Sequence, residues 1–368
     1  MRYDFAPKLA HVITTYSTAI KEGDFVVILG NTEAVPLIEA LYEAVLRQGG
    51  NPVIQLDIPG LHEMRLALAG DRQLDFMNPI QKLVVEEADV ILAIQAPSNT
   101  KSLASSDPAR ITRWQQALAP LMPVQLRRMG DGSLRWCLMA WPTAAAAQQT
   151  DMGLHAYTEF LFRAYALDQE DPVAHWRGVR ALHERLLAFL GGKSHVEVKG
   201  PDIELSFDYG GREWVSAHGE VNFPDGEIFT GPVEASVNGY VHFNMPTIHQ
   251  GREVNGVCLT FKDGKVVEAS ASKGEDYLLS QLELDEGARW LGEFAIGTNR
   301  GVDRVTGSTL LDEKIGGSIH LALGASLPQT KGVNESQLHW DMVHDLKNGG
   351  EIYVDGQLFN RGGEFTVA

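Results

Sequence analysis

Five side chains that can bind metal ions or transfer protons lie close together near the C-terminus. They occur within residues 310–342: Asp312, Glu313, His320, His339 and Asp341. The residues between them are largely apolar and interrupted by glycine, so a buried carboxylate or imidazole there needs a cation, a hydrogen-bond partner or water. His339 and Asp341 are two positions apart, and in an extended segment such residues point to the same face. Mixed nitrogen and oxygen donors are typical of sites for zinc, cobalt, manganese or iron.

Two glutamates earlier in the chain belong to the same candidate set. Glu293 lies in the apolar stretch LGEFAIG, where burying an unpaired carboxylate would be costly. Glu227 lies in NFPDGEIFTGPVE. Taken singly, each residue has a structural interpretation, because a histidine in an apolar strand is often a hydrogen-bonded core residue and an acidic residue beside glycine often caps a turn. Only the coincidence of the whole set favours a metal site.

Several other histidines are not assigned to this set. His175 and His183 lie in a predicted helix, and we expect them at the surface or at an interface. We expect His242, His249 and His344 to have structural roles.

The second half of the chain must position the candidate residues on strands. From His195 onward, apolar and polar residues alternate between turn signals, which is typical of half-buried antiparallel strands. One helix is expected at about residues 274–284. The apolar neighbours of His320 place its imidazole on a buried strand.

The first half has a different hydrophobic period. An apolar run at residues 25–30, a helical pattern at 31–50 and a second apolar run at 51–57 predict two parallel strands joined by a helix. Further buried strands are expected at residues 90–97, 123–129 and 136–142, and bridging helices at 157–168 and 173–190. Neither G-x-G-x-x-G nor G-x-x-x-x-G-K-[ST] occurs, so a nucleotide-binding loop is not expected.

These patterns predict two domains of different fold class in one chain. The N-terminal part should be a mostly parallel, open α/β sheet domain, and the C-terminal part a mainly antiparallel β domain. A length of 368 residues also favours two domains. We place them at residues 1–190, which include the bridging helices, and at residues 191–368, which contain every candidate ligand.

Composition restricts the partners and the compartment. The formal net charge of −17 is spread along the chain and would repel a phosphate backbone, so nucleic acid is not an expected partner. The N-terminus lacks an apolar signal segment, and no run of eighteen apolar residues occurs, so neither export nor a membrane partner is expected. The only cysteines, Cys137 and Cys258, form no disulfide framework, which favours a reducing cytoplasm.

Four blocks of the second half resemble, in order, the motifs of one peptidase family. The blocks are NFPDGEIFTGPVE, GARWLGEFAIGTN, LLDEKIGGSIHLALG and NESQLHWDM. They are similar to the motifs of the aminopeptidase T and aminopeptidase S family, which comprises thermophile-type leucyl metallo-aminopeptidases. The resemblance is specific over the C-terminal half. Over the first half it extends only to the general α/β pattern.

The resemblance implies an activity and a role for each candidate. Members are cytoplasmic homodimers that remove N-terminal residues from small peptides with two divalent ions, commonly zinc or cobalt, in a catalytic C-terminal domain. Manganese or magnesium also remains open here. Glu313 corresponds to the general acid/base of the family. The positions that correspond to its metal ligands are Glu227, Glu293, His320, His339 and Asp341, with Glu293 expected to bridge the two ions.

One position departs from the family pattern. The family usually has a tyrosine near the metals, seven residues after the histidine that corresponds to His320, and this chain has Leu327 there. Leucine can neither bind an ion nor stabilise an oxyanion. A metal-binding homologue that has lost catalysis is therefore one alternative. A second alternative is a mononuclear Fe(II) ring-cleaving dioxygenase of the dihydroxypyridine type, which has a similar fold and a His-x-Asp pair similar to His339 and Asp341.

Overall fold

The computed structural model describes residues 3–367, and its contacts separate two units. The first consists of Met1–Val173 with Gly219–Pro224, and the second of Ala174–His218 with Asp225–Ala368. Helix α10 (Pro172–Leu190) contributes Leu186 and Leu190 to the core of the second unit. Its apolar residues recur at the same helical spacing as those of the preceding helices, so hydrophobic period alone did not assign it to this unit. The domain limits predicted above, at residues 1–190 and 191–368, remain a proposal.

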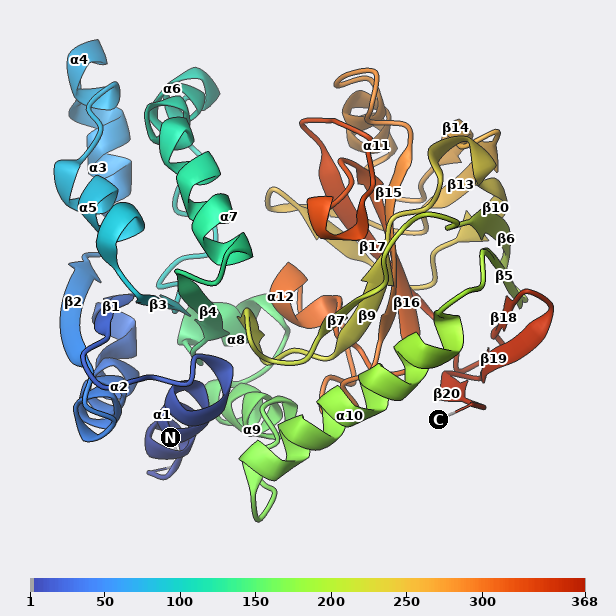
Figure 1. The fold of residues 1–368 in the computed structure, drawn as a ribbon. Coiled ribbons are helices and arrows are strands. Elements are labelled where there is room, and N and C mark those ends of the chain that lie inside the picture. The colour runs from blue at the N-terminus through green and yellow to red at the C-terminus, as the bar shows by residue number, and fades with distance from the viewer. Residues whose placement is uncertain (1–2, 368) are drawn as a thin grey trace. The chain divides into compact units, whose positions relative to one another are not determined.

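The first unit is built on a parallel sheet with helices (Figure 1). Its strands pair in the order β2-β1-β3-β4-β8, all in parallel. The strands are β1 (Phe25–Asn31), β2 (Asn51–Asp57), β3 (Val90–Gln95), β4 (Arg135–Ala140) and β8 (Asn222–Phe223). The helices are α1 (Phe5–Val12), α2 (Val35–Arg47), α3 (Leu61–Leu68), α4 (Asp71–Leu74), α5 (Pro79–Glu87), α6 (Pro108–Leu118), α7 (Met122–Gly130), α8 (Ala144–Gln149) and α9 (Leu154–Ala164). The strand–helix–strand unit predicted at residues 25–57 is confirmed.

The strand predicted at residues 123–129 is wrong. This segment forms helix α7, which has a proline in its first turn and no buried residue. Proline is favoured at the start of a helix because its fixed φ suits the first turn and its missing N–H is not needed there. The short apolar run was therefore part of an exposed helix, not of a buried strand.

The second unit contains two antiparallel sheets with a shared apolar core. The larger sheet has the order β14-β13-β10-β6-β5-β18-β19-β20, and the smaller has the order β17-β16-β15-β9-β7. The larger sheet comprises β5 (His195–Gly200), β6 (Ile203–Asp208), β10 (Asn238–His242), β13 (Cys258–Lys262), β14 (Lys265–Ser270), β18 (Glu351–Val354), β19 (Gln357–Arg361) and β20 (Glu364–Phe365). The smaller sheet comprises β7 (Val215–Ala217), β9 (Glu227–Thr230), β15 (Leu291–Gly297), β16 (Ser318–Gly324) and β17 (His339–Asp345). A hairpin of β11 (Thr247–His249) and β12 (Arg252–Val254), with helices α11 (Glu275–Leu282) and α12 (Thr309–Asp312), completes the unit.

One face of the smaller sheet packs into the apolar core, and the candidate residues lie on the other face. Phe294, Leu321 and Trp340 point from β15, β16 and β17 into a core that also includes Val198 and Phe207 of the larger sheet. Successive side chains of a strand alternate between the two faces. The residues next to these core positions therefore point to the opposite face. These findings confirm the predicted fold class.

No helix within residues 3–367 is both long enough and apolar enough to cross a lipid bilayer.

Candidate metal centre

The five predicted ligands lie on neighbouring strands of the smaller sheet, on the face away from the core. Antiparallel pairing sets Ala322 of β16 opposite Glu293 of β15 and opposite Asp341 of β17. Residues paired in this way point to the same face. Ala322 is buried but outside the core cluster, and its small side chain lies between the two carboxylates. The strand pairing thus brings together residues that are distant in sequence.

A bulge in β15 directs Glu293 to this face. The pairing with β16 shifts between Leu291 and Glu293, so that Leu291 points into the core while Glu293 points to the opposite face. Gly292 is the extra residue, and a Cβ atom there would lie 2.4 Å from the carbonyl oxygens of Gly324 and Ala325. Only glycine fits this close approach, and bulges commonly redirect side chains at active sites.

His320 lies at the centre of the buried part of the cluster. Its Nε2 atom is 3.7 Å from Oε2 of Glu227, 3.6 Å from Oε1 of Glu293 and 3.9 Å from Oδ1 of Asp341. All four side chains are buried or nearly so. The three oxygens therefore surround one imidazole nitrogen at distances longer than a normal hydrogen bond.

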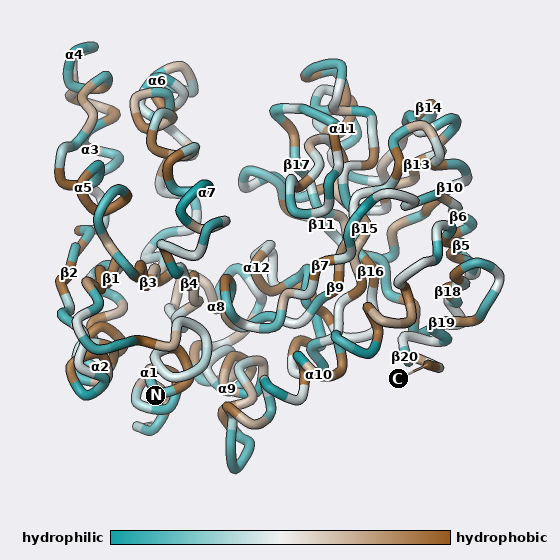
Figure 2. Tube along the Cα trace, viewed as in Figure 1, coloured by the Kyte–Doolittle hydropathy of each residue, from teal (hydrophilic) through white to brown (hydrophobic). Residues whose placement is uncertain are grey.

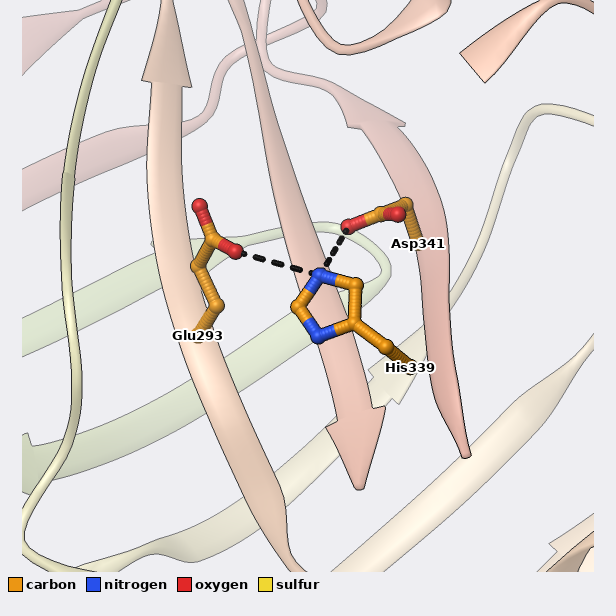
Figure 3. A group of neighbouring side chains, drawn as sticks. All are labelled: Glu293, His339 and Asp341. Atoms are coloured by element: carbon orange, nitrogen blue, oxygen red, sulfur yellow. Dashed lines mark ion pairs between the residues drawn. The ribbon is translucent and has the colours of Figure 1, made fainter. Parts of the chain in front are cut away.

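His339 forms the more open part of the cluster and lies beside Glu293 and Asp341 (Figure 3). Its Nε2 atom is 3.4 Å from Oε2 of Glu293 and 3.6 Å from Oδ1 of Asp341. The other ring nitrogen, Nδ1, lies 2.9 Å from the carbonyl oxygen of Ala325 and donates its proton to it, so Nε2 is the ring nitrogen directed at the carboxylates. The side chain of His339 is 31% exposed, so water and small molecules reach the cluster here.

The charges of the cluster favour cations. Burial lowers the pKa of both imidazoles, but the carboxylates outweigh it and raise the pKa to about 9 for His320 and about 10 for His339. Burial raises the pKa of Glu227 and Asp341. Burial also acts to raise the pKa of Glu293, but its contacts with both histidines dominate and lower it. The cluster therefore holds positive charge tightly, on protons when no metal ion is present.

The donor atoms fit divalent ions. Two atoms at roughly tetrahedral positions, each about 2.1 Å from one zinc ion, are about 3.4 Å apart. The separations of 3.4 to 3.9 Å found here are close to this value. Within the described residues, Oε2 of Glu227 and Oδ1 of Asp341 are buried without a hydrogen-bond partner, an arrangement that a bound cation would satisfy. Glu293, His339 and Asp341 can each offer an atom to a single ion.

Lys314, which was not among the predicted site residues, connects Glu313 with this cluster. The ammonium group of Lys314 contacts Glu227, lies 2.8 Å from Oε2 of Glu313 and 3.7 Å from Oδ1 of Asp225. Lys314 is completely buried. A lysine within the apolar, glycine-rich block that carries His320 was a signal of a buried charge, just as the setting of Glu293 was.

Asp312 and His183 have structural environments. The carboxylate of Asp312 accepts hydrogen bonds from the backbone N–H groups of Thr306 and Gly307, which fixes the loop before α12. His183 is fully buried, so of the two positions expected for it, at the surface or at an interface, the surface position is wrong. Its ring nitrogens lie 2.8 Å from the hydroxyl of Ser216 and 2.9 Å from that of Thr298. Burial lowers the pKa of His183 to about 3, so it stays neutral.

Comparisons with known proteins identify relatives similar in sequence and structures similar in fold. "Aminopeptidase 2" of Geobacillus stearothermophilus is 27% identical over 95% of this chain and 93% of its own. The structure of wild-type AmpT from Thermus thermophilus matches with a TM-score of 0.86 at 26% identity, over 98% of this chain and 99% of that one. The 2,5-dihydroxypyridine dioxygenase of Pseudomonas putida KT2440 shares the fold, with a TM-score of 0.62 at 12% identity, over 100% of this chain and 99% of that one.

The family model described as "Thermophilic metalloprotease (M29)" matches residues 5–365, which is nearly the whole chain. A metalloprotease uses a divalent metal ion to hydrolyse peptide bonds, and the donor cluster on the smaller sheet is suited to bind one. The chain is accordingly a metal-dependent hydrolase of peptide bonds and belongs to the thermophilic metalloprotease family M29.

Proposed function

We propose that this protein is an aminopeptidase that releases N-terminal residues from small peptides with two divalent ions. The relatives named as aminopeptidases support the exopeptidase activity. The observation that carries the two-ion proposal is the position of Glu293, whose Oε1 faces His320 and whose Oε2 faces His339. One carboxylate thus contributes to two groups of donors.

Each group contains an imidazole and a second carboxylate. In the proposal, Glu227, Glu293 and His320 hold one ion, while Glu293, His339 and Asp341 hold the other. Zinc and cobalt suit such nitrogen and oxygen donors best, and manganese or magnesium are further candidates. The ions, when bound, polarise the scissile carbonyl and lower the pKa of a nearby water to about 7.

The side chains perform the remaining steps of the proposed reaction. Glu313 takes a proton from the attacking water and transfers it to the leaving amine. His339 keeps its Nε2 lone pair on the metal side because the carbonyl of Ala325 holds its Nδ1 proton. The partly exposed edge at His339 admits the peptide, whose free α-amino group binds an ion or a carboxylate of the cluster.

Elemental analysis of the purified protein, together with a panel of aminoacyl-p-nitroanilides, tests the proposal. We expect about two equivalents of a divalent metal per chain and hydrolysis of one or more aminoacyl substrates in air and under nitrogen. One iron per chain and ring cleavage only with oxygen would instead identify a dioxygenase, for which the fold is the present support. No turnover with added Zn²⁺ or Co²⁺ would identify an inactive homologue.

We also propose a homodimer, as the resemblance implies. β2 lies at the edge of the parallel sheet and exposes Val53, Ile54 and Leu56, and the following segment exposes Leu61 and Met64. Figure 2 shows brown, hydrophobic stretches along β2 and α3. An exposed edge strand with apolar side chains is a ready surface for a second copy. Sedimentation velocity tests this proposal, and a single species with the mass of one chain would exclude it.

A further inference from the structure

A buried lysine connects the proposed general base with a proposed metal ligand. The Nζ atom of Lys314 lies 2.8 Å from Oε2 of Glu313 and donates a hydrogen bond to Oε1 of Glu227. Asp225 provides a third carboxylate, whose Oδ1 is 3.7 Å away. Lys314 is 0% exposed, so every partner of its ammonium group is internal.

The backbone around Lys314 is held in one position. Its carbonyl oxygen accepts a hydrogen bond of 3.0 Å from the N–H of Asn299, and the N–H of Gly316 donates one of 2.9 Å to the carbonyl of Asn299. A Cβ atom on Gly297 would lie 2.2 Å from the carbonyl oxygen of Ile315, so the turn lies tightly against the end of β15. The direction in which the lysine stem leaves the backbone is therefore fixed.

The environment of Lys314 excludes direct contact with a substrate. Its ammonium group is surrounded by carboxylates and is not accessible, so it cannot donate to a peptide carbonyl. Burying a charge costs several kcal/mol before its partners compensate, and apolar residues often stabilise a fold equally well. A role in the reaction is the better explanation for a lysine at this position.

The ammonium group also completes a charge balance. Asp225, Glu227, Glu293, Glu313 and Asp341 supply five negative charges when all are ionised. Lys314 reduces these to four, which two divalent ions neutralise while both histidines are neutral. Without the lysine, the same two ions would leave one excess negative charge beside the attacking water.

We propose that Lys314 is a positioning residue that makes Glu227 a one-oxygen metal ligand and fixes the carboxylate of Glu313 beside the ions. This proposal rests on the proposed function. The lysine engages Oε1 of Glu227, so only Oε2, which faces His320, is directed at an ion. It also engages Oε2 of Glu313, so the other oxygen of that carboxylate is left for the proton of the water.

Lys314→Met tests this role, because methionine retains most of the volume and removes the charge. We expect kcat to fall about 100-fold, since small displacements of a catalytic group have effects of this size. Co²⁺ affinity should stay the same or increase, because the cluster loses a competing positive charge. The visible absorption of bound Co²⁺ should weaken, because Glu227 can then offer both oxygens and raise the coordination number. Lys199→Met, which removes an exposed ion pair with Glu197, is the control.

The double variant Asp225→Asn/Lys314→Met separates positioning from charge compensation. It removes one acid together with the lysine and so preserves the net charge of the cluster. We expect it to fold and to bind Co²⁺, yet to keep the low kcat and the altered spectrum. Restoration of the wild-type kcat, an unchanged kcat in Lys314→Met, or loss of metal together with activity would each overturn the proposal. So would failure of both variants to fold, which would assign Lys314 a structural role.

The proposed function can fail separately from this inference. If wild-type protein binds Co²⁺ but hydrolyses no aminoacyl substrate, the aminopeptidase proposal fails, while the Co²⁺ spectrum of Lys314→Met still reports on Glu227. If the wild type is active and Lys314→Met matches it in kcat and in spectrum, only the role of Lys314 is excluded.

Discussion

The Oε2 atom of Glu293 lies 3.4 Å from the Nε2 atom of His339, although another strand separates β15 from β17 in the sheet (Figure 3). The second oxygen of Glu293 faces His320, which lies on that intervening strand. A single carboxylate thus joins the deep and the open parts of the candidate metal centre.

Glu293→Gln should weaken metal binding more than any other single amide substitution in the cluster. The amide keeps the shape but removes the negative charge that both histidines share. Loss of a residue that only supports a ligand costs about 10–100-fold in metal affinity, so loss of a shared ligand should cost more than about 100-fold. Calorimetric titration with Zn²⁺ measures this, with Glu286→Gln, at a residue outside the cluster, as the control. Retention of two tightly bound ions would show that Glu293 does not bridge.

Ala322→Leu should prevent metal binding while the fold survives. Ala322 lies between Glu293 and Asp341 in the sheet, on the face where ions would bind. Leucine would fill this space, and overpacking of a well-packed site costs about 1–3 kcal/mol, which a protein of this size tolerates. Ala322→Gly keeps the space open and is the matched control. We expect elemental analysis to find metal in the glycine variant only, and full occupancy in the leucine variant would contradict the proposed place of the ions.

The pattern of strands was largely predictable from the sequence, because hydrophobic period reports on local structure. The exposure of β2 was not, since its continuous apolar run is typical of a buried strand but Val53, Ile54 and Leu56 lie exposed at the sheet edge. Residues 25–57 and the apolar run that carries His320 follow the predicted arrangement. The segment that forms α7 does not, because seven residues with three apolar side chains besides proline fit an exposed helix as well as a strand.

The bulge at Gly292 and the position of Lys314 could not be predicted in this way. Both depend on contacts between segments far apart in the chain: Gly292 with the carbonyls after β16, and Lys314 with Glu227. Hydrophobic period contains no information about such contacts. The resemblance to a family supplied the set of ligands, and the sheet pairing explains how residues so distant in sequence reach one another.

Glu313→Gln should remove turnover and keep the metal. Glutamine keeps an oxygen near Lys314 but cannot accept the proton of the attacking water. General acid/base catalysis typically contributes about 10²–10⁴-fold, so we expect kcat to fall within this range with unchanged metal content. Glu335→Gln, at an exposed residue of the same region, is the control. If Glu313→Gln retained most activity with its metal in place, Glu313 could not be the general base.

The stabilising effect of metal should increase with pH between about 6.5 and 9. Without metal, the folded-state pKa values of His320 and His339 are about 9 and about 10, above the ordinary value of 6.5. Their protonation therefore stabilises the metal-free fold fully below pH 6.5, and this contribution is lost as the pH rises through 9 to 10. Metal binds the neutral imidazoles, so its affinity increases over the same range. Thermal melts of metal-loaded and EDTA-treated protein measure the gap in Tm, and a gap that narrows with pH would contradict this assignment.

Leu327→Tyr should increase turnover. The aminopeptidase T and aminopeptidase S family usually has tyrosine at this position, and Leu327 lies in the loop between β16 and β17, close in sequence to Ala325, which holds His339. A phenol there can donate a hydrogen bond to the oxyanion that forms on the scissile carbonyl, and one such donor is worth about 10²–10³-fold in kcat in a site that has evolved around it. Because the site of this chain has not evolved around a tyrosine, we expect a smaller increase in kcat, of about 10-fold, measured with the best substrate of the aminoacyl panel. Leu327→Phe supplies the ring without the hydroxyl and should give no gain. Equal effects of the two substitutions would assign the change to packing, and a fall in kcat with tyrosine would show that this chain has a different arrangement around its metal ions.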